Sequence, residues 1–201
     1  MSAPARIIVG ISGATGIVYG VRLLELLREC GVETHLVVSR AAELTRAHEL
    51  PLSAEQLRAL ATHAYPIGDV GASLSSGSFQ TLGMVVAPCS MRTLGEIAGG
   101  VTTNLLTRAA DVTLKERRRL VLLVRETPLT AVHLRNMLTV TEAGAIVAPP
   151  VPAFYTRPTT LDEIVTQTAS RVLDLLGIAV PGATRWGEQI ELSPMPRERG
   201  A

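Results

Sequence analysis

The sequence predicts a single α/β domain in which a parallel β-sheet is flanked by helices. Short apolar runs rich in Ile, Val and Leu recur along the chain, and each leads through turn residues into an amphipathic segment. The 201 residues are 47% apolar, which is enough to build the core of one domain. There are no internal repeats. We therefore expect one domain over residues 1–201, with residues 181–201 forming a polar C-terminal tail.

Charge and cysteine content exclude several classes of function. The chain has 19 basic and 18 acidic residues, so no global field recruits nucleic acid. Its two cysteines are too few for a disulfide framework, and the first residues do not resemble a signal peptide. No apolar run approaches the ~20 residues that span a bilayer. These features predict a cytoplasmic protein with no membrane span, and its small apolar residues hint at buried subunit interfaces.

The first element is an apolar strand beginning near Arg6, followed by a glycine-rich turn and an amphipathic helix from Val21 to Glu29. The turn reads Ser-Gly-Ala-Thr-Gly over residues 12–16. Ser12, Thr15 and the N–H groups of the helix start are expected to face an anionic group, favoured by ~0.3–1 kcal/mol of helix dipole energy. This predicts a phosphate or nucleotide cradle. The glycine spacing alone also fits some nicotinamide enzymes, or a turn that needs small residues only for packing.

The second strand is expected at 34–39 and the following helix at 40–48, with Glu49 at its end. The strand ends in Ser39-Arg40 rather than in an acidic residue, which argues against NAD and leaves NADP possible. Short-chain nicotinamide enzymes also need a Tyr with a Lys four residues later. None of the three tyrosines has one.

A capping box over Ser53–Gln56 predicts a short helix to about Ala61. The next 20 residues, 62–81, are polar and rich in Gly and Ser. Loops of ~20 residues are uncommon inside compact domains and are usually functional. A disordered surface excursion is the alternative.

The third strand, expected at 82–87, runs into Pro88-Cys89-Ser90, where Ser90 is placed to cap a helix. Ligands of open parallel sheets lie beyond the carboxyl ends of the strands, so this turn and the 12–16 turn are expected to face one crevice. Cys89 at a strand end is interpreted as a packing residue rather than a nucleophile.

A helix from Asn104 to Glu116 places Arg108, Asp111 and Lys115 on one face. The basic run at 117–119 is interpreted as solvated. A fourth strand at 120–124 ends in Arg125-Glu126, which predicts an ion pair at the carboxyl edge of the sheet.

The C-terminal third contains a helix at 130–143 closed by Gly144, a fifth strand at 145–148, and a stiff loop, 149–155, that holds two aromatic residues. A capping box at Thr160–Glu163 opens a last helix, which ends at Gly177. The tail carries the only tryptophan, Trp186.

Several short motifs occur in a compatible order from Ile7 to about Trp186. They are Ser12-Gly13-Ala14-Thr15-Gly16, Ser75-Ser76-Gly77-Ser78, Pro88-Cys89-Ser90, Arg108-Ala109-Ala110-Asp111-Val112, Leu114-Lys115-Glu116-Arg117, Arg125-Glu126-Thr127-Pro128-Leu129, His133-Leu134 and Pro152-Ala153-Phe154-Tyr155. In these motifs the sequence closely resembles the flavin prenyltransferases, the UbiX-like proteins that serve UbiD-type decarboxylases.

The resemblance implies a three-layer Rossmann-like (flavodoxin-like) α/β fold. It also implies that the enzyme transfers the dimethylallyl group of dimethylallyl phosphate to N5 and C6 of reduced FMN. The product, prenylated FMN, would serve a UbiD-type decarboxylase, and the family is associated with ubiquinone biosynthesis. A homo-dodecamer with sites shared between subunits is implied as well.

Site residues follow from the same resemblance. FMN would be bound by Gly13, Ala14, Thr15, Ser39, Ser90, Met91, Arg92, Thr93 and Arg125. The prenyl phosphate would be bound by Tyr155, Arg171 and Lys115, with Arg108 nearby and the Ser76-Gly77 loop covering the site. Glu49 and Glu126 resemble the acid/base carboxylates of the family, and Lys115 counts among the catalytic groups. The chain has no Asp-Asp-x-x-Asp motif for magnesium, so no metal is expected in the reaction.

Two departures and two alternatives bear on this reading. Thr15 stands where many relatives have Ser, and Thr103 where Asp is common. An FMN-dependent cysteine decarboxylase of related fold is the runner-up among flavoproteins, although no His is placed as its base. The chain could also be a non-catalytic flavin-binding subunit of an aromatic acid decarboxylase. Acceptance of dimethylallyl diphosphate stays open.

Overall fold

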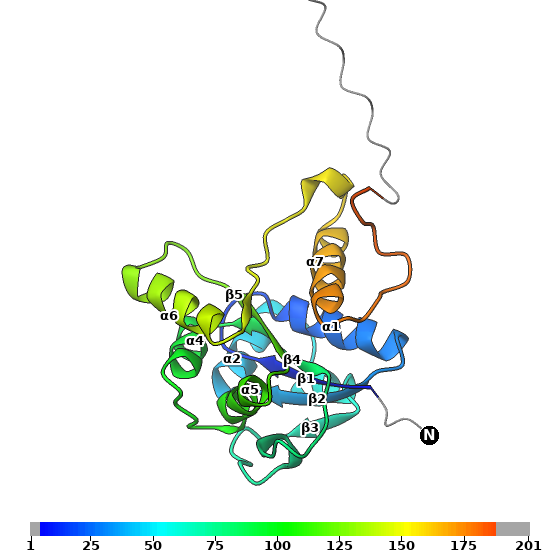
Figure 1. The fold of residues 1–201 in the computed structure, drawn as a ribbon. Helices are drawn as coiled ribbons and strands as arrows, with labels where there is room; N and C mark the ends of the chain where they lie inside the picture. The colour runs from blue at the N-terminus through cyan, green and yellow to red at the C-terminus, as the bar shows by residue number, and fades with distance from the viewer. Residues whose placement is uncertain (1–4, 188–201) are drawn as a thin grey trace, which may run out of the picture.

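In the computed structural model, which describes residues 5–187, six parallel strands form one sheet in the order β3-β2-β1-β4-β5-β6 (Figure 1). The strands are β1 Arg6–Ile11, β2 Glu33–Val38, β3 His63–Tyr65, β4 Gly83–Cys89, β5 Arg119–Val124 and β6 Ile146–Val147. Without the three-residue edge strand β3, the order of the remaining strands is that of flavodoxin. The chain order reverses between β1 and β4, and this switch point is where open α/β sheets bind ligands.

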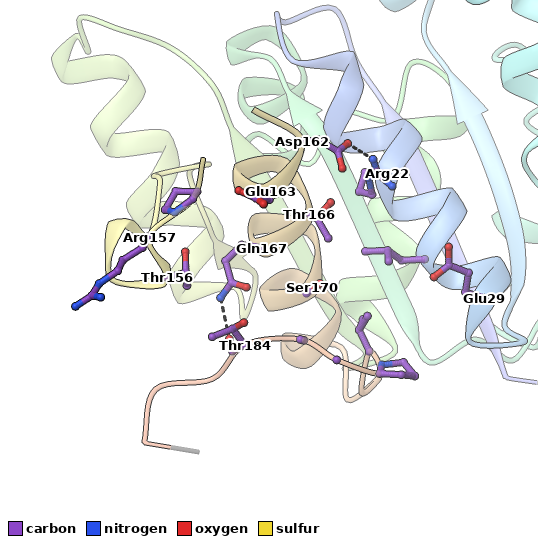
Figure 2. Close-up of a pocket in the computed structure, with 16 residues that line it drawn as sticks. Arg22, Glu29, Thr156, Arg157, Asp162, Glu163, Thr166, Gln167, Ser170 and Thr184 are labelled. Carbon is purple, nitrogen blue, oxygen red and sulfur yellow. Dashed lines mark hydrogen bonds and ion pairs between the residues drawn. The ribbon is translucent and has the colours of Figure 1, made fainter. Parts of the chain in front are cut away.

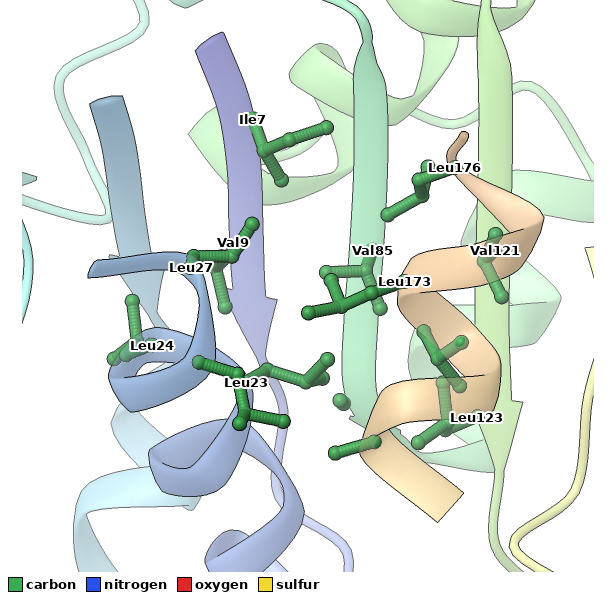
Figure 3. Close-up of a cluster of buried hydrophobic side chains, with 14 of the residues drawn as sticks. Ile7, Val9, Leu23, Leu24, Leu27, Val85, Val121, Leu123, Leu173 and Leu176 are labelled. Atoms are coloured by element: carbon green, nitrogen blue, oxygen red, sulfur yellow. The ribbon is translucent and has the colours of Figure 1, made fainter. Parts of the chain in front are cut away.

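Helices cover both faces of the sheet, as expected for three layers. They are α1 Ile17–Glu29, α2 Arg40–Glu49, α3 Ala54–Ala59, α4 Met91–Ala98, α5 Leu105–Lys115, α6 Ala131–Glu142 and α7 Leu161–Leu175, with short 3₁₀ turns η1 Ser73–Ser75 and η2 Phe154–Thr156. On one face, α1 and α7 pack side chains such as Leu23 and Leu173 against Val9 and Val85 (Figure 3).

The opposite face is covered by α4, α5 and α6. Successive strand residues point to opposite faces, so Ile8 and Met84 join a second core with Leu94, Leu106 and Val140. Strand residues such as Val9 and Val85 are fully buried, because a parallel sheet with helices on both faces leaves its central strands no solvent side. The three-layer fold predicted from the sequence is confirmed.

Two predicted boundaries are wrong. Helix α1 begins at Ile17, not at Val21, because Gly16 adopts a left-handed conformation (φ 102°) that turns the chain directly into the helix. The 62–81 segment is not one loop: His63–Tyr65 forms the edge strand β3 and Ser73–Ser75 forms η1. A strand of three residues, His-Ala-Tyr, has no apolar run to reveal it.

Other local predictions are confirmed. The capping boxes at Ser53 and Thr160 both form, and Gly144 and Gly177 have positive φ after α6 and α7. Residues 188–201 of the expected tail lie outside the described residues. Within residues 5–187 no helix combines the length and apolar character needed to cross a bilayer.

Candidate active site

The turns that follow β1 and β4 are tied together by Ser12. Its side chain is fully buried; the hydroxyl donates to the carbonyl oxygen of Pro88 (2.9 Å) and accepts from the N–H of Ser90 (2.7 Å). Both turns therefore stand at the switch point in a fixed relation. The single crevice expected from the sequence is confirmed.

A cavity of about 350 Å³ opens beside these turns. Its lining contains five of the residues expected to bind FMN and seven others: Gly13, Ser39, Ser90, Arg92 and Thr93, then Arg40, Ala41, Ile67, Gly68, Glu96, Thr103 and Asn104. Ala14, Thr15, Met91 and Arg125 are not among the lining residues. We refer to this cavity as the cradle.

The start of α2 forms one wall of the cradle. A Cβ atom at position 13 would lie 2.3 Å from the Cβ of Ala41, so only glycine lets the first turn approach α2 this closely. Ser39 caps α2, its hydroxyl accepting from the N–H of Ala42 (3.1 Å). The positive end of the α2 dipole and the Arg40 residue beside it suit a phosphate group.

The opposite wall is held by Glu96. Its carboxylate accepts from Arg92 Nε (3.0 Å), Thr103 Oγ1 (3.2 Å) and Asn104 Nδ2 (3.3 Å). Ser90 caps α4 by accepting from the N–H of Thr93. The cradle thus offers two helix starts, cations and hydroxyl groups, a donor set that fits the phosphate and polyol chain of a flavin mononucleotide.

Arg40, Glu96 and Asn104 were missed by the site prediction. Arg40 follows a predicted strand directly, so the rule that ligands lie beyond strand ends was a usable signal. Asn104 caps α5, accepting from the N–H of Thr107 (3.1 Å), and its position at a predicted helix start carried the same kind of signal. Glu96 lies inside α4 and nothing in the sequence marks it.

The start of α1 is not open to an anion, contrary to the prediction. The carboxylate of Glu49, at the end of α2, accepts from the N–H groups of Gly16 (3.1 and 3.0 Å) and Ile17 (2.9 Å). The chain supplies this anion from a residue 33 positions further on, a contact that no local pattern encodes. The cradle is lined instead by the starts of α2 and α4, and Thr15, next to Gly16, is exposed.

Arg125 and Glu126 follow β5 at the same edge of the sheet, and both are exposed. The predicted ion pair between them does not form in the described structure: the Glu126 carboxylate accepts from the N–H of Thr127 (3.0 Å). The backbone N–H of Arg125 donates to the carbonyl of Cys89 (3.1 Å), which continues the β4–β5 pairing.

The serine loop, residues 73–79, lies against α5. Arg108 donates to the carbonyl of Ser75 (3.2 Å) and pairs with Asp111 (2.8 Å). Gly77 packs against the ion pair of Lys115 with Glu116 (2.5 Å). The predicted covering loop is thus next to two of the predicted phosphate ligands.

From the sequence, the basic run at 117–119 is interpreted as solvated, but Arg118 and Arg119 make hydrogen bonds within the fold. Arg118 donates to the carbonyls of Gly77 (2.6 Å) and Phe79 (2.7 Å), and Arg119 donates to the carbonyl of Leu175 (3.0 Å). Arginine presents several donors in a planar fork, which lets Arg118 bind two carbonyls of the serine loop at once.

Tyr155 and Arg171 line a separate cavity of about 290 Å³ on η2 and α7, together with Trp186. The rings of Tyr155 and Trp186 meet edge to face with centroids 5.1 Å apart. Arg108 and Lys115 belong to α5, on the other face of the sheet from α7. Within one chain the structure therefore does not gather the four predicted phosphate ligands into one cavity.

A larger cavity, about 510 Å³, lies between α1, α7 and the segment after α7 (Figure 2). Arg22 pairs with Asp162 there, and Gln167 donates to the carbonyl of Thr184 (2.9 Å). None of the predicted site residues lines it, so its size does not make it the candidate site.

Cys89 is fully buried, and burial raises the pKa of its thiol to about 12. Such a thiol carries no appreciable thiolate at neutral pH. Its interpretation as a packing residue is confirmed.

A cradle at the switch point of a three-layer parallel sheet, walled by two helix starts, defines a nucleotide-binding α/β protein. Residues 1–173 match the family model described as Flavoprotein. The chain is 58% identical over 181 residues to the flavin prenyltransferase UbiX of Neisseria meningitidis serogroup B, covering 90% of this chain and 96% of the relative. The chain therefore belongs to the UbiX flavin prenyltransferase family of flavoproteins.

Solved structures agree. The crystal structure of AnUbiX (PadA1) in complex with FMN and dimethylallyl pyrophosphate has a TM-score of 0.90 and 48% identity, covering 92% of this chain and 98% of that one. The dodecameric FMN-dependent Ubix-like decarboxylase from Escherichia coli O157:H7 has a TM-score of 0.88 and 50% identity, covering 90% of this chain and 98% of that one.

Proposed function

We propose that this chain transfers the dimethylallyl group of dimethylallyl phosphate to N5 and C6 of reduced FMN, without a metal ion. The observation that carries the proposal is the cradle: two helix starts and cationic residues at the switch point form a mononucleotide site in a member of the UbiX family. The transfer breaks the allylic C–O bond, releases phosphate and forms carbon bonds to N5 and C6. The C=C bond of the prenyl group becomes a single bond; its central carbon gains one proton while N5 and C6 each lose one, so the flavin gains C5H8.

The cradle residues bind FMN in this proposal. Gly13 allows the turn after β1 to pack closely against α2, and Ser39 caps that helix. The positive end of α2 binds the phosphate of FMN. Ser90, Arg92 and Thr93 bind from the start of α4. Ala14, Thr15, Met91 and Arg125 complete the proposed FMN-binding set.

The leaving phosphate is bound by Lys115, Arg171 and the Tyr155 hydroxyl, with Arg108 beside them. Positive groups placed where the leaving group develops charge stabilise the transition state, and the Ser76-Gly77 loop keeps water from the allylic cation. Glu126 or Glu49 accepts the proton from C6. Of the two, Glu49 is anchored to the start of α1 and Glu126 is exposed.

The proposed phosphate ligands lie on two separate parts of the chain, so we propose that neighbouring subunits complete each site. The E. coli O157:H7 relative is dodecameric, and a homo-dodecamer is proposed here as well. Exposed apolar residues on α6, η2 and α7, including Leu138, Phe154 and Leu161, are suited to such interfaces.

In this proposal the product is delivered to a UbiD-type decarboxylase in the cytoplasm. Service in ubiquinone biosynthesis stays a prediction. A non-catalytic flavin-binding subunit is not favoured, because the matched relative is named as an enzyme and Glu49, Lys115, Glu126, Tyr155 and Arg171 are all present.

The test is anaerobic and metal-free: reduced FMN and dimethylallyl phosphate are added to the purified full chain, and the flavin is weighed by mass spectrometry. We expect a gain of one C5H8 unit. Bound FMN of unchanged mass would favour the accessory-subunit function, and no bound flavin would contradict both. A parallel reaction with dimethylallyl diphosphate determines which prenyl donor is used.

A further inference from the structure

Three potential metal ligands meet at the amino-terminal ends of β2 and β3, whereas the cradle lies beyond the carboxyl ends of the strands. Glu33 begins β2, His35 follows two residues later on the same face, and His63 begins the edge strand β3. In the parallel register His35 lies directly beside His63. Strand pairing therefore fixes the relative positions of all three side chains.

The ligand atoms have the spacing of a transition-metal site. His35 Nε2 is 3.0 Å and His63 Nε2 is 3.4 Å from the same Glu33 oxygen, Oε1, and the three atoms lie within 4.8 Å of one another. Tetrahedral zinc with bonds of ~2.0–2.2 Å places its ligand atoms about 3.4 Å apart. The two distances to Glu33 are within a few tenths of an ångström of this value, and the half-exposed His63 side chain can move closer to His35 to complete the site.

Surrounding groups hold these ligands in place. The Tyr65 hydroxyl lies 2.9 Å from His35 Nδ1, and Arg6 Nε donates to Glu33 Oε2 (3.2 Å), leaving Oε1 directed at the imidazoles. Phe79 packs edge-on against the His35 ring, with centroids 5.0 Å apart. Metal-binding histidines usually have such a partner on the second ring nitrogen.

The cluster is also accessible. His35 is 2% exposed, whereas the His63 side chain is 52% exposed and borders a cavity of about 450 Å³ with Glu33, Thr62 and Arg28. The open cavity lets water reach the cluster as the fourth ligand. Of the two arginines nearby, Arg28 donates to the carbonyl of Ala59 (2.7 Å) and Arg6 is held by Glu33.

We propose that Glu33, His35 and His63 form a binding site for a first-row divalent transition metal, best matched by Zn²⁺. Two imidazoles and one carboxylate suit zinc better than magnesium or calcium, which prefer oxygen ligands. The ion cross-links β2 to the edge strand β3. Because Ser39 lies six residue steps along the strand from Glu33, at ~3.3 Å a step, the site lies about 20 Å from the cradle and takes no part in prenyl transfer.

Zinc binding by the full chain, purified without a histidine tag and stripped with a chelator, tests this proposal. We expect calorimetric titration with ZnCl₂ to give one ion per chain and the metal to raise the Tm. His63→Gln removes one ligand from a half-exposed position and is expected to weaken binding at least tenfold and to abolish the rise in Tm. His48→Gln, at an exposed histidine outside the cluster, is the matched control and is expected to bind as the wild type does.

Substitution with Co²⁺ provides a second measurement, because tetrahedral cobalt with imidazole ligands absorbs in the visible region. The absorption is expected in the wild type and in His48→Gln but not in His63→Gln. Equal zinc binding by all three proteins, or no binding by the wild type, would overturn the proposal. Prenyl transfer by the metal-free protein is expected to be unchanged, so this result and that of the proposed function are independent.

Discussion

At the scale of single residues, Glu49 has a structural contact in addition to its proposed chemistry. Its carboxylate accepts from two N–H groups at the start of α1, where a negative charge is favoured by the helix dipole. The same contact fixes where the carboxylate stands beside the exposed Thr15. The structural contact of Glu49 with α1 and its proposed role as a proton acceptor can therefore be separated by a substitution that keeps one oxygen acceptor.

Glu49→Gln is expected to abolish prenyl transfer, because the amide cannot take the C6 proton, while FMN binding is retained. The loss of charge at the helix start should lower the free energy of unfolding by about 1 kcal/mol. Product mass, flavin titration and urea denaturation measure the three effects. Glu142→Gln, on the exposed end of α6, is the control. Wild-type turnover by Glu49→Gln would contradict the role of Glu49.

Cys89 is expected to resist alkylation in the folded protein. With a pKa of about 12, its thiolate fraction at pH 8 is on the order of 1 in 10⁴, and the side chain is fully buried. Iodoacetamide followed by peptide mass spectrometry should find Cys89 modified only after denaturation. Cys89→Ala should retain prenyl transfer; rapid labelling of the native protein would refute this description of the thiol.

At the scale of elements, the serine loop is held in place by side chains of α5 and of the turn that follows it. Arg118 binds two of its carbonyls, and Arg108 binds a third. The loop, which is proposed to cover the site, is therefore held in place by arginine side chains from outside it.

Arg118→Ala is expected to loosen this loop, since each hydrogen bond from a charged donor contributes up to ~1.5–3 kcal/mol. Hydrogen exchange of the amides in 73–81 should accelerate at least tenfold, with a higher KM for the prenyl phosphate. Arg117→Ala, which changes an exposed neighbour, serves as the control. Unchanged exchange in Arg118→Ala would show that the loop is held by other contacts.

The limits of prediction are clearest in these elements. The long strands and helices followed from apolar runs and capping boxes, because those signals are local. The edge strand β3 was missed because its three residues, His-Ala-Tyr, are too few to show an apolar pattern and pair only in the presence of β2. The cradle turns were found from their glycines and serines, but the Glu49 contact was not, because it joins residues 33 positions apart.

At the scale of the whole molecule, the chain exposes apolar side chains that its own fold does not cover. Leu134 and Leu138 are 54% and 58% exposed and lie one turn apart on α6. The proposed phosphate ligands are likewise divided between α5 and the α7 region. Both features agree with a catalytic unit larger than one chain.

Leu138→Asp is expected to reduce the mass of the assembly, because it places a charge in an apolar subunit contact. Light scattering after size-exclusion chromatography measures the mass, and prenyl transfer should fall with it. Thr139→Asp adds the same charge at the next, polar position and should leave the assembly intact. A monomeric wild type, or an unaltered mass for Leu138→Asp, would contradict the shared-site proposal.

The buried hydroxyl of Ser12 has a consequence for anyone who wants to transplant this flavin site. One side chain joins the turn after β1 to the turn after β4, more than 70 residues later in the chain. The two turns consequently form one inseparable module. A graft onto another sheet must carry both turns with the strand pair between them, whereas a copied glycine-rich segment alone would lose its partner.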